Sequence, residues 1–140
     1  MRVLVLAAFM LIPIGCTQIK SEGEINGYTY SIGSEVSYTE LKGVSGYYML
    51  ENDDEGTFTY VITSGNMGEG DAIKITDLKM DDNNNLSIIV KTTHSKASEA
   101  PAVVTYPYCY LEISVKPNSV KITDEAGFEY NYIQEEESAS

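Results

Sequence analysis

The sequence predicts an all-β protein, and more specifically a small antiparallel β-sandwich, for which an immunoglobulin-like arrangement is one candidate form. Short runs rich in Tyr, Thr, Val and Ile recur along the chain and are separated by Gly, Asn and Asp. Several runs alternate between apolar and polar residues, and no window shows the apolar spacing of an amphipathic helix. The chain has 140 residues, of which 43% are hydrophobic, which is enough for the core of one domain.

The expected strands are short and separated by turn residues. They cover residues 28–32, 35–41, 46–50, 57–63, 72–78, 86–92, 103–115, 119–123 and 128–133. The alternation is clear in residues 57–63, where Phe58, Tyr60 and Ile62 share one face of the strand. Two polar stretches, 81–85 and 124–127, contain the Asp, Asn and Gly residues that favour hairpin turns.

The N-terminus predicts a bacterial lipoprotein signal peptide. Arg2 precedes an unbroken apolar run, residues 3–12, which is shorter than the roughly 18 residues of a membrane-spanning helix. Pro13-Ile14-Gly15-Cys16 resembles the box at which such signals are cut, although Leu is usual where Pro13 stands. Cys16 would then be lipidated and become the new N-terminus. An ordinary secretory signal is the alternative, but no A-x-A-like site lies near Gly15.

This interpretation divides the chain into four parts. Residues 1–15 are the signal peptide, 16–24 a lipidated polar tether, 25–134 the sandwich and 135–140 a disordered acidic tail. One acyl chain holds a protein weakly and reversibly, whereas two anchor it stably. The predicted location is therefore the bacterial cell envelope, on the extracytoplasmic side of a membrane.

The charge of the chain excludes one class of partner. With 21 acidic and 9 basic residues the formal net charge is −12, so a polyanion such as nucleic acid would be repelled. Anionic headgroups are repelled for the same reason. Removal of Arg2 with the signal peptide makes the charge more negative still, and we expect the body to stand clear of the headgroups on its tether.

Three segments occur in an order typical of a known family. They are Tyr-Val-Ile-Thr-Ser-Gly at 60–65, Ala-Ile-Lys-Ile at 72–75 and Thr-Tyr-Pro-Tyr at 105–108. Over residues 57–115 the chain resembles the C-terminal domain of the PrcB family, lipoproteins named for stabilising a protease complex. The family has Thr-Gly-Gly-Tyr where this chain has Gly-Glu-Gly-Asp at 68–71. The resemblance implies a non-catalytic role in a protein complex, with an extracytoplasmic protease as partner.

The residues around Pro107 form the candidate protein-binding site. Because proline cannot donate to a sheet ladder, Pro107 predicts an edge strand or a bulge. Alternation places Tyr106, Tyr108 and Tyr110 on one face of this strand and Cys109 on the other. Two hypotheses remain open: the tyrosines pack across strands as part of the fold, or the edge and its tyrosines bind a partner by strand addition. A carbohydrate or small-molecule module with exposed tyrosines is the alternative function.

The sequence offers little for catalysis or metal binding, and we predict no enzyme and no cofactor. A hydrolase using Cys109 or the acidic turns is the weakest hypothesis, because alternation buries Cys109 and nothing pairs it with His94. Asp81-x-Asn83-x-Asn85 faintly resembles a calcium loop, but Leu86 and Thr92 stand where such a loop needs Gly and Glu. A hairpin turn is the favoured interpretation of residues 81–85.

Overall fold

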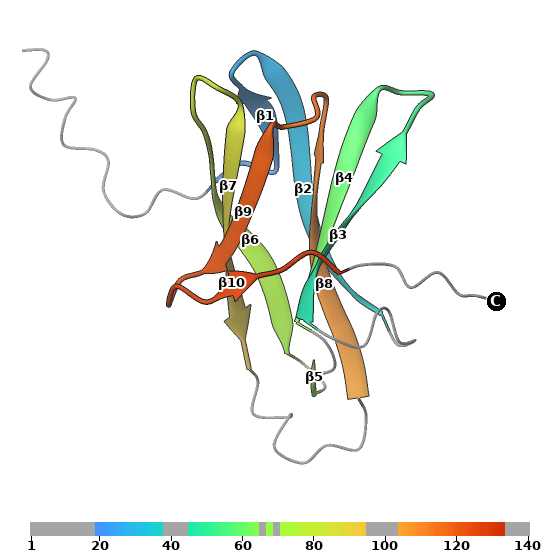
Figure 1. Ribbon diagram of the computed structural model, residues 1–140. Coiled ribbons are helices and arrows are strands. Elements are labelled where there is room, and N and C mark those ends of the chain that lie inside the picture. The colour runs from blue at the N-terminus through green and yellow to red at the C-terminus, as the bar shows by residue number, and fades with distance from the viewer. Residues whose placement is uncertain (1–18, 38–44, 65–66, 69–70, 95–103, 134–140) are drawn as a thin grey trace, which may run out of the picture.

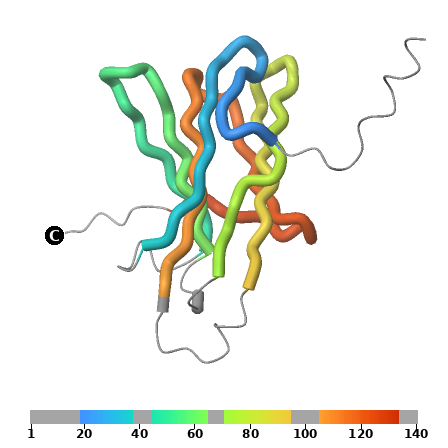
Figure 2. The backbone as a smooth tube through the Cα atoms, turned by 180° about the vertical axis from the view of Figure 1, so that it is seen from behind, coloured from blue at the N-terminus to red at the C-terminus, as the bar shows by residue number. Residues whose placement is uncertain are grey.

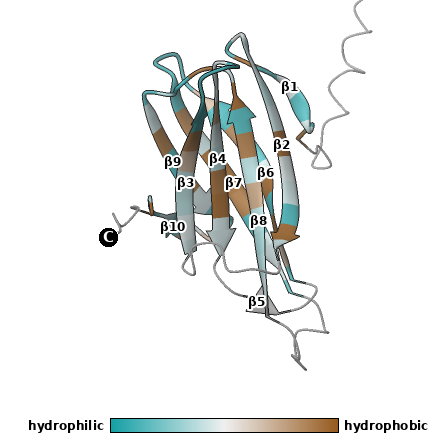
Figure 3. Cartoon of the chain, turned by 90° about the vertical axis from the view of Figure 1, so that its right-hand side faces the viewer, coloured by the Kyte–Doolittle hydropathy of each residue, from teal (hydrophilic) through white to brown (hydrophobic). Residues whose placement is uncertain are grey.

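The predicted fold class is confirmed by a computed structural model that describes residues 19–37, 45–64, 67–68, 71–94 and 104–133. Within these residues the chain forms two β-sheets that pack face to face, and it contains no helix (Figure 1). The strands carry apolar residues at alternate positions, as expected for sheets that each bury one face (Figure 3).

The first sheet is antiparallel throughout. Its strands lie in the order β1 (Glu22–Ile25), β2 (Tyr28–Ser37), β8 (Val104–Ile113), β4 (Thr57–Ser64) and β3 (Ser45–Asn52). The two-residue strand β5 (Met67–Gly68) also pairs with β8, beyond the end of the β4 ladder. Strand β8 is therefore an inner strand, hydrogen-bonded on both sides.

The second sheet is mixed. Its order is β10 (Glu129–Tyr130), β9 (Ser119–Asp124), β7 (Asn85–Thr93) and β6 (Ala72–Met80), and β7 and β9 run parallel. The sequence did not predict this parallel pair. It arises because residues 114–118 carry the chain from β8 in the first sheet to β9 in the second, so that β9 reaches β7 by a crossover instead of a hairpin.

The core lies between the two sheets. Ile62 and Leu111 from the first sheet and Ile88 from the second are completely buried, and each such aliphatic side chain contributes about 1.5–3 kcal/mol by its transfer from water. The inward row predicted for residues 57–63 is confirmed, with Tyr60 4% and Ile62 0% exposed. The other buried apolar residues of this cluster are Ile73, Ile75, Leu86, Val90, Cys109, Ile113, Ile122 and Tyr130.

The folded body begins earlier than predicted. Residues 19–24 were expected to belong to the tether, but β1 starts at Glu22, and the Ile32 N–H donates to the Ser21 carbonyl at 2.8 Å. The segment has no long apolar alternation. Instead Gly23 pairs with Tyr30, whose ring lies 3.1–3.3 Å from the place a Cβ would occupy on Gly23. The tyrosine thus covers the glycine, which stabilises an edge strand that composition alone does not indicate.

The C-terminal segment crosses from the second sheet to the edge of the first. The Tyr47 N–H donates to the Asn131 carbonyl at 3.0 Å, and the Ile133 N–H donates to the Tyr47 carbonyl at 2.7 Å. Tyr132 packs edge-on against Tyr47 with ring centroids 5.5 Å apart. This segment pairs with the outer edge of β3, and unpaired edges are where strands of other chains add.

Gly46 permits this close approach, and we predict that Gly46→Ala separates the segment from β3. The φ of Gly46 is 153°, and an added Cβ would lie 2.6 Å from the Asn131 carbonyl oxygen. Gly56→Ala is the matched control, because Gly56 has φ 67° but open space around its Cβ position. We expect Gly56→Ala to lower the free energy of unfolding by about 1 kcal/mol, and Gly46→Ala by a further 1–3 kcal/mol or so. Urea denaturation measures both, and equal losses would contradict the clash.

Candidate functional site

The predicted lipid attachment site lies outside the described residues. Cys16, the signal peptide at 1–15 and the acidic tail at 135–140 all fall in this category. In the part of the chain that the structure describes, there is no helix with the length and apolarity needed to cross a membrane.

Three of the predicted binding residues lie together on the outer face of the first sheet. Along β8, Cys109, Leu111 and Ile113 are fully buried, whereas Tyr106, Tyr108 and Tyr110 alternate with them and are partly exposed. The predicted division of this strand into two faces is therefore confirmed.

A fourth tyrosine belongs to the same surface. In the register of the sheet, Tyr48 of β3 pairs with Val61 of β4, and Val61 pairs with Tyr110 of β8. Val61 is only 6% exposed although it faces away from the core. We call Tyr48, Tyr106, Tyr108 and Tyr110 the tyrosine face. The doublet at 47–48 was visible in the sequence, but only the structure shows which of its rings points outward.

Gly33 shapes one end of the tyrosine face. It pairs with Tyr110, and a Cβ on Gly33 would lie 2.5 Å from the Tyr110 hydroxyl oxygen and 2.7 Å from the ring carbon that carries it. The ring of Tyr110 therefore lies across β2, in the space that the missing side chain leaves. The sequence suggested two strands, at 28–32 and 35–41, but the structure has one strand through Gly33, which serves as a seat for the ring.

The tyrosine face is acidic. The Tyr108 hydroxyl donates to a carboxylate oxygen of Glu35 at 3.3 Å, and burial together with the Glu35 charge raises the Tyr108 pKa above its usual value. Glu112, the next outward residue of β8, accepts a hydrogen bond from the Thr57 hydroxyl at 3.0 Å. The described strand residues on this face include no lysine or arginine.

Pro107 does not lie on an edge strand, and that prediction is wrong. It is buried in β8, between β2 and β4. Its carbonyl accepts a hydrogen bond from the Thr63 hydroxyl at 3.4 Å, so its missing N–H faces the same side of the strand. On that side the β4 ladder ends at Thr63–Tyr108 and the β5 ladder resumes at Met67–Thr105. Proline is tolerated because the ladder is interrupted there.

The bulge alternative for Pro107 stays a prediction, because residues 65–66 lie outside the described residues. Neither the β4 ladder nor the β5 ladder includes Tyr106 or Pro107 in its register. The alternation of the tyrosines along β8 is preserved through this interruption.

The two candidate catalytic side chains, Cys109 and His94, have separate surroundings. Cys109 is 0% exposed, and burial raises the pKa of its thiol, which keeps the thiol protonated and inert. His94 instead pairs with Asp71, its Nδ1 lying 3.2 Å from a carboxylate oxygen. Asp71 is 4% exposed and the His94 side chain is 68% exposed. No local pattern indicates this pair, because 23 residues separate its members.

We predict that Cys109 resists thiol reagents in the folded protein. The protonated thiol of Cys109 is a poor nucleophile, and its position in the core keeps the reagent away from the sulfur. Labelling should therefore require unfolding. The measurement is the rate of labelling by a maleimide in buffer and in concentrated urea, with Cys109→Ala as the control for other reactive groups. Labelling in buffer at the rate found in urea would revive the hydrolase hypothesis.

Residues 81–85 form the turn between β6 and β7, so the predicted hairpin turn is confirmed. One carboxylate oxygen of Asp81 accepts the N–H groups of Asn83 and Asn85, both at 2.9 Å, and the other accepts the Asn85 side-chain amide at 3.1 Å. Asn84 has φ 62°, a left-handed conformation that Asn tolerates. The carboxylate is thus occupied by the turn itself. The described residues contain no group of three His, Cys, Asp or Glu side chains placed to hold a metal ion.

The Asp81 turn should make stability depend on pH in the acidic range. Its hydrogen bonds with Asn85 lower the pKa of the carboxyl below the unfolded value. The stabilisation is therefore present above the unfolded pKa and is lost as the pH falls through the lower folded pKa. Asp81→Asn should flatten this part of the stability curve, with Asp82→Asn in the same turn as the control for removal of one negative charge. Urea midpoints measured from pH 6 down to about pH 2 decide this, and parallel curves for Asp81→Asn and the unchanged chain would contradict it.

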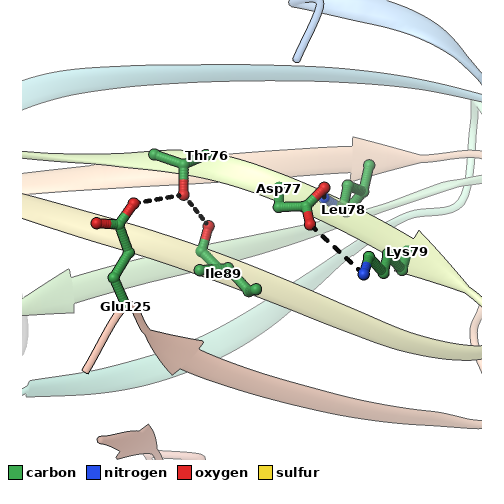
Figure 4. Close-up of polar contacts among 6 residues, drawn as sticks. All are labelled: Thr76, Asp77, Leu78, Lys79, Ile89 and Glu125. Carbon is green, nitrogen blue, oxygen red and sulfur yellow. Dashed lines mark hydrogen bonds and ion pairs between the residues drawn. The ribbon is translucent and has the colours of Figure 1, made fainter. Parts of the chain in front are cut away.

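A groove runs along β6 where this strand bulges. The register between β6 and β7 shifts between Ile75 and Asp77, so Thr76 is the additional residue. Its hydroxyl can donate to the Ile89 carbonyl at 3.3 Å or to a carboxylate oxygen of Glu125 at 3.4 Å (Figure 4). Figure 4 also shows Asp77 with its carboxylate toward Lys79, at 3.9 Å.

The bulge opens a cavity of about 860 Å³ between β6 and the N-terminal part of the chain. Ile19, Glu24 and Tyr30 line it on one side, and Thr76 and Glu125 on the other. Several of its walls are acidic, but the carboxylates of Asp77 and Glu125 already contact Lys79 and Thr76. The groove itself was not predicted from the sequence, although the inward apolar positions shift from Ile73 and Ile75 to Leu78 and Met80 across the bulge, which is its signature in the alternation.

Comparison with protein families, curated proteins and solved structures finds no match to this chain. The resemblance to the PrcB family therefore stays a prediction. What the chain does has to be argued from the tyrosine face and its surroundings.

Proposed function

We propose that this chain is a lipid-anchored, non-catalytic protein of the bacterial cell envelope that binds another extracytoplasmic protein through the tyrosine face. The observation that carries the proposal is the row of three partly exposed tyrosines on β8, joined by Tyr48, on the outer face of a sheet. Tyrosine gives large contact area with few rotatable bonds and one polar group, and it is enriched in protein interfaces.

The support of the tyrosine face favours binding over simple packing. Strand β8 is held by β2 and β4, so the rings stand on a rigid part of the fold. The Tyr110 ring lies across Gly33, and Tyr108 is held by Glu35. Side chains that are already ordered lose less conformational entropy when a partner binds.

The mode of binding differs from the strand addition that the sequence suggested. The backbone groups of β8 are taken up by β2 and β4, so a partner contacts the side chains of the tyrosine face and not the strand edge. On this proposal Pro107 shapes the sheet and does not contact the partner.

A protease complex is the partner that the PrcB resemblance supports. Tyr106 and Tyr108 belong to the Thr-Tyr-Pro-Tyr segment on which that resemblance depends. The membrane anchor is supported by the signal-like N-terminus and by Cys16. Since Cys109 is buried and His94 pairs with Asp71, the described residues favour a role without catalysis.

We predict that Tyr108→Ala weakens capture of the partner while the fold stays intact. Tyr108 points away from the core, so its loss should cost about 1 kcal/mol of stability or less. As a hot spot of the interface it should cost about 2 kcal/mol or more of binding free energy, a thirtyfold loss of affinity. The matched control is Thr123→Ala, on the outer face of the second sheet. The measurement is cross-linking in cells, recovery of the chain and quantitative identification of the co-purified proteins, beside urea denaturation of each variant.

Two results would contradict the proposal. If Tyr108→Ala lowers stability strongly and leaves partner recovery unchanged, the tyrosine face is part of the packing of the fold. If no protein is recovered but soluble glycans raise the melting temperature of the unchanged chain and not of Tyr108→Ala, the face binds carbohydrate.

A further inference from the structure

Two lysines lie directly opposite one another on the outer face of the second sheet. Lys74 of β6 and Lys91 of β7 are paired in the register, and both are exposed. Their neighbours Ile73, Ile75 and Val90 are buried, so the two ammonium-bearing side chains point to the same side of the sheet. Like charges in directly opposite positions destabilise a sheet. The chain has 21 acidic residues and only 9 basic ones, so two lysines in directly opposite positions are unexpected. The fold does not explain why they are paired.

The same two lysines line a cavity of about 390 Å³. Its other walls include the hydroxyl-bearing residues Ser21 and Ser34 and the apolar side chain of Ile19. Ile32 and Gly33, which like Ser34 belong to β2 of the first sheet, also line it. Two ammonium groups surrounded by hydroxyl donors suit an anion with several acceptor oxygens. We call this cavity the lysine pocket.

The acidic groups nearby do not neutralise the lysine pocket. Glu125 is the one carboxylate among its lining residues, and its oxygen lies 3.4 Å from the Thr76 hydroxyl. No described carboxylate lies within 4.0 Å of either Lys74 or Lys91, whereas Lys79 has Asp77 and Lys116 has Glu51 at that range.

The length of the connecting chain limits how far the lysine pocket can lie from the proposed anchor. Ile19 lines the pocket, and Figure 2 shows the blue start of the described chain beside the yellow-green β6. Three peptide units separate Ile19 from Cys16, and a fully extended chain spans at most about 11 Å over them. A lipid on Cys16 would therefore hold this side of the sandwich at the surface of the bilayer.

We propose that the lysine pocket binds the phosphate of an anionic lipid headgroup in the membrane that anchors the chain. The inference rests on the proposed lipidation of Cys16. Lys74 and Lys91 supply two positive charges, and the hydroxyls of Ser21 and Ser34 supply neutral donors to the remaining phosphate oxygens. The contact fixes the orientation of the body on the membrane, in addition to the attachment that the lipid provides.

The net charge of −12 does not prevent this contact. Charges interact in physiological salt over a Debye length of about 8 Å. Exposed charges separated by more than this distance in solvent are largely screened. The local charge at Lys74 and Lys91 decides the interaction, and each lysine close to an anionic surface adds a favourable contribution.

The test is the reactivity of each lysine in the membrane-bound, full-length protein. Membranes from producing cells are treated with an amine-acylating reagent, and labelling is read at each lysine by mass spectrometry before and after solubilisation in detergent. The purified protein is then reconstituted into vesicles of phosphatidylcholine, with and without phosphatidylglycerol. Lys74 and Lys91 should label about fivefold more slowly in membranes and in phosphatidylglycerol vesicles. Lys116, which is also exposed, is the internal control and should not change.

Each other result overturns the inference. Equal labelling of Lys74, Lys91 and Lys116 in membranes means that the lysine pocket does not contact headgroups, and the anchor is unaffected by that result. Protection of the solubilised protein by inorganic phosphate, with no additional effect of phosphatidylglycerol, means that the pocket takes a free anion. If Cys16→Ala leaves membrane fractionation unchanged, Cys16 does not carry the lipid anchor. The proposed contact with a headgroup, which rests on that anchor, is then contradicted as well.

Discussion

Strand β8 exchanges hydrogen bonds with β2 on one side and β4 on the other, and this double pairing constrains the rest of the molecule. A slip of one residue would turn Leu111 and Ile113 to solvent and bring the tyrosines into the core. The positions of the tyrosines are thus set by the same register that buries the apolar row. The tyrosine face needs no separate scaffold, because the core residues of β8 hold it in place (Figure 1).

Local patterns along the chain predicted those parts of the structure that depend on alternation. The two faces of β8, the burial of Cys109 and the turn at Asp81 follow from residues adjacent in the sequence. One part of the Pro107 environment was predictable, because a proline cannot donate a ladder hydrogen bond. The sequence does not say whether that bond is missing on the β2 side or the β4 side of β8. That side is set by where β4 ends and β5 begins, which depends on pairing between residues more than 35 positions apart.

Features made by distant residues were not predictable in this way. The parallel pairing of β7 and β9 depends on a crossover between sheets. Strand β1 was assigned to the tether because its polar sequence lacks alternation, and it forms because Gly23 is covered by Tyr30. A tyrosine ring also covers Gly33, which lies opposite Tyr110. Such a pair can be recognised only when it is known which strands are neighbours.

The early start of β1 changes what the net charge implies. A tether of residues 16–24 would let an acidic body stand clear of headgroups, but β1 begins at Glu22 and Ile19 already lines the lysine pocket, so only a short connection leads to Cys16. With so short a connection, the interaction with the membrane depends less on the net charge of the chain than on which charged side chains face the bilayer. Lys74 and Lys91 lie on the second sheet, but Gly33 and Ser34 of β2 in the first sheet also line the lysine pocket, so a bound headgroup would lie where β2 meets β6. None of the four residues of the tyrosine face lines this pocket. A headgroup bound at the lysines would therefore leave the tyrosine rings accessible to a protein partner.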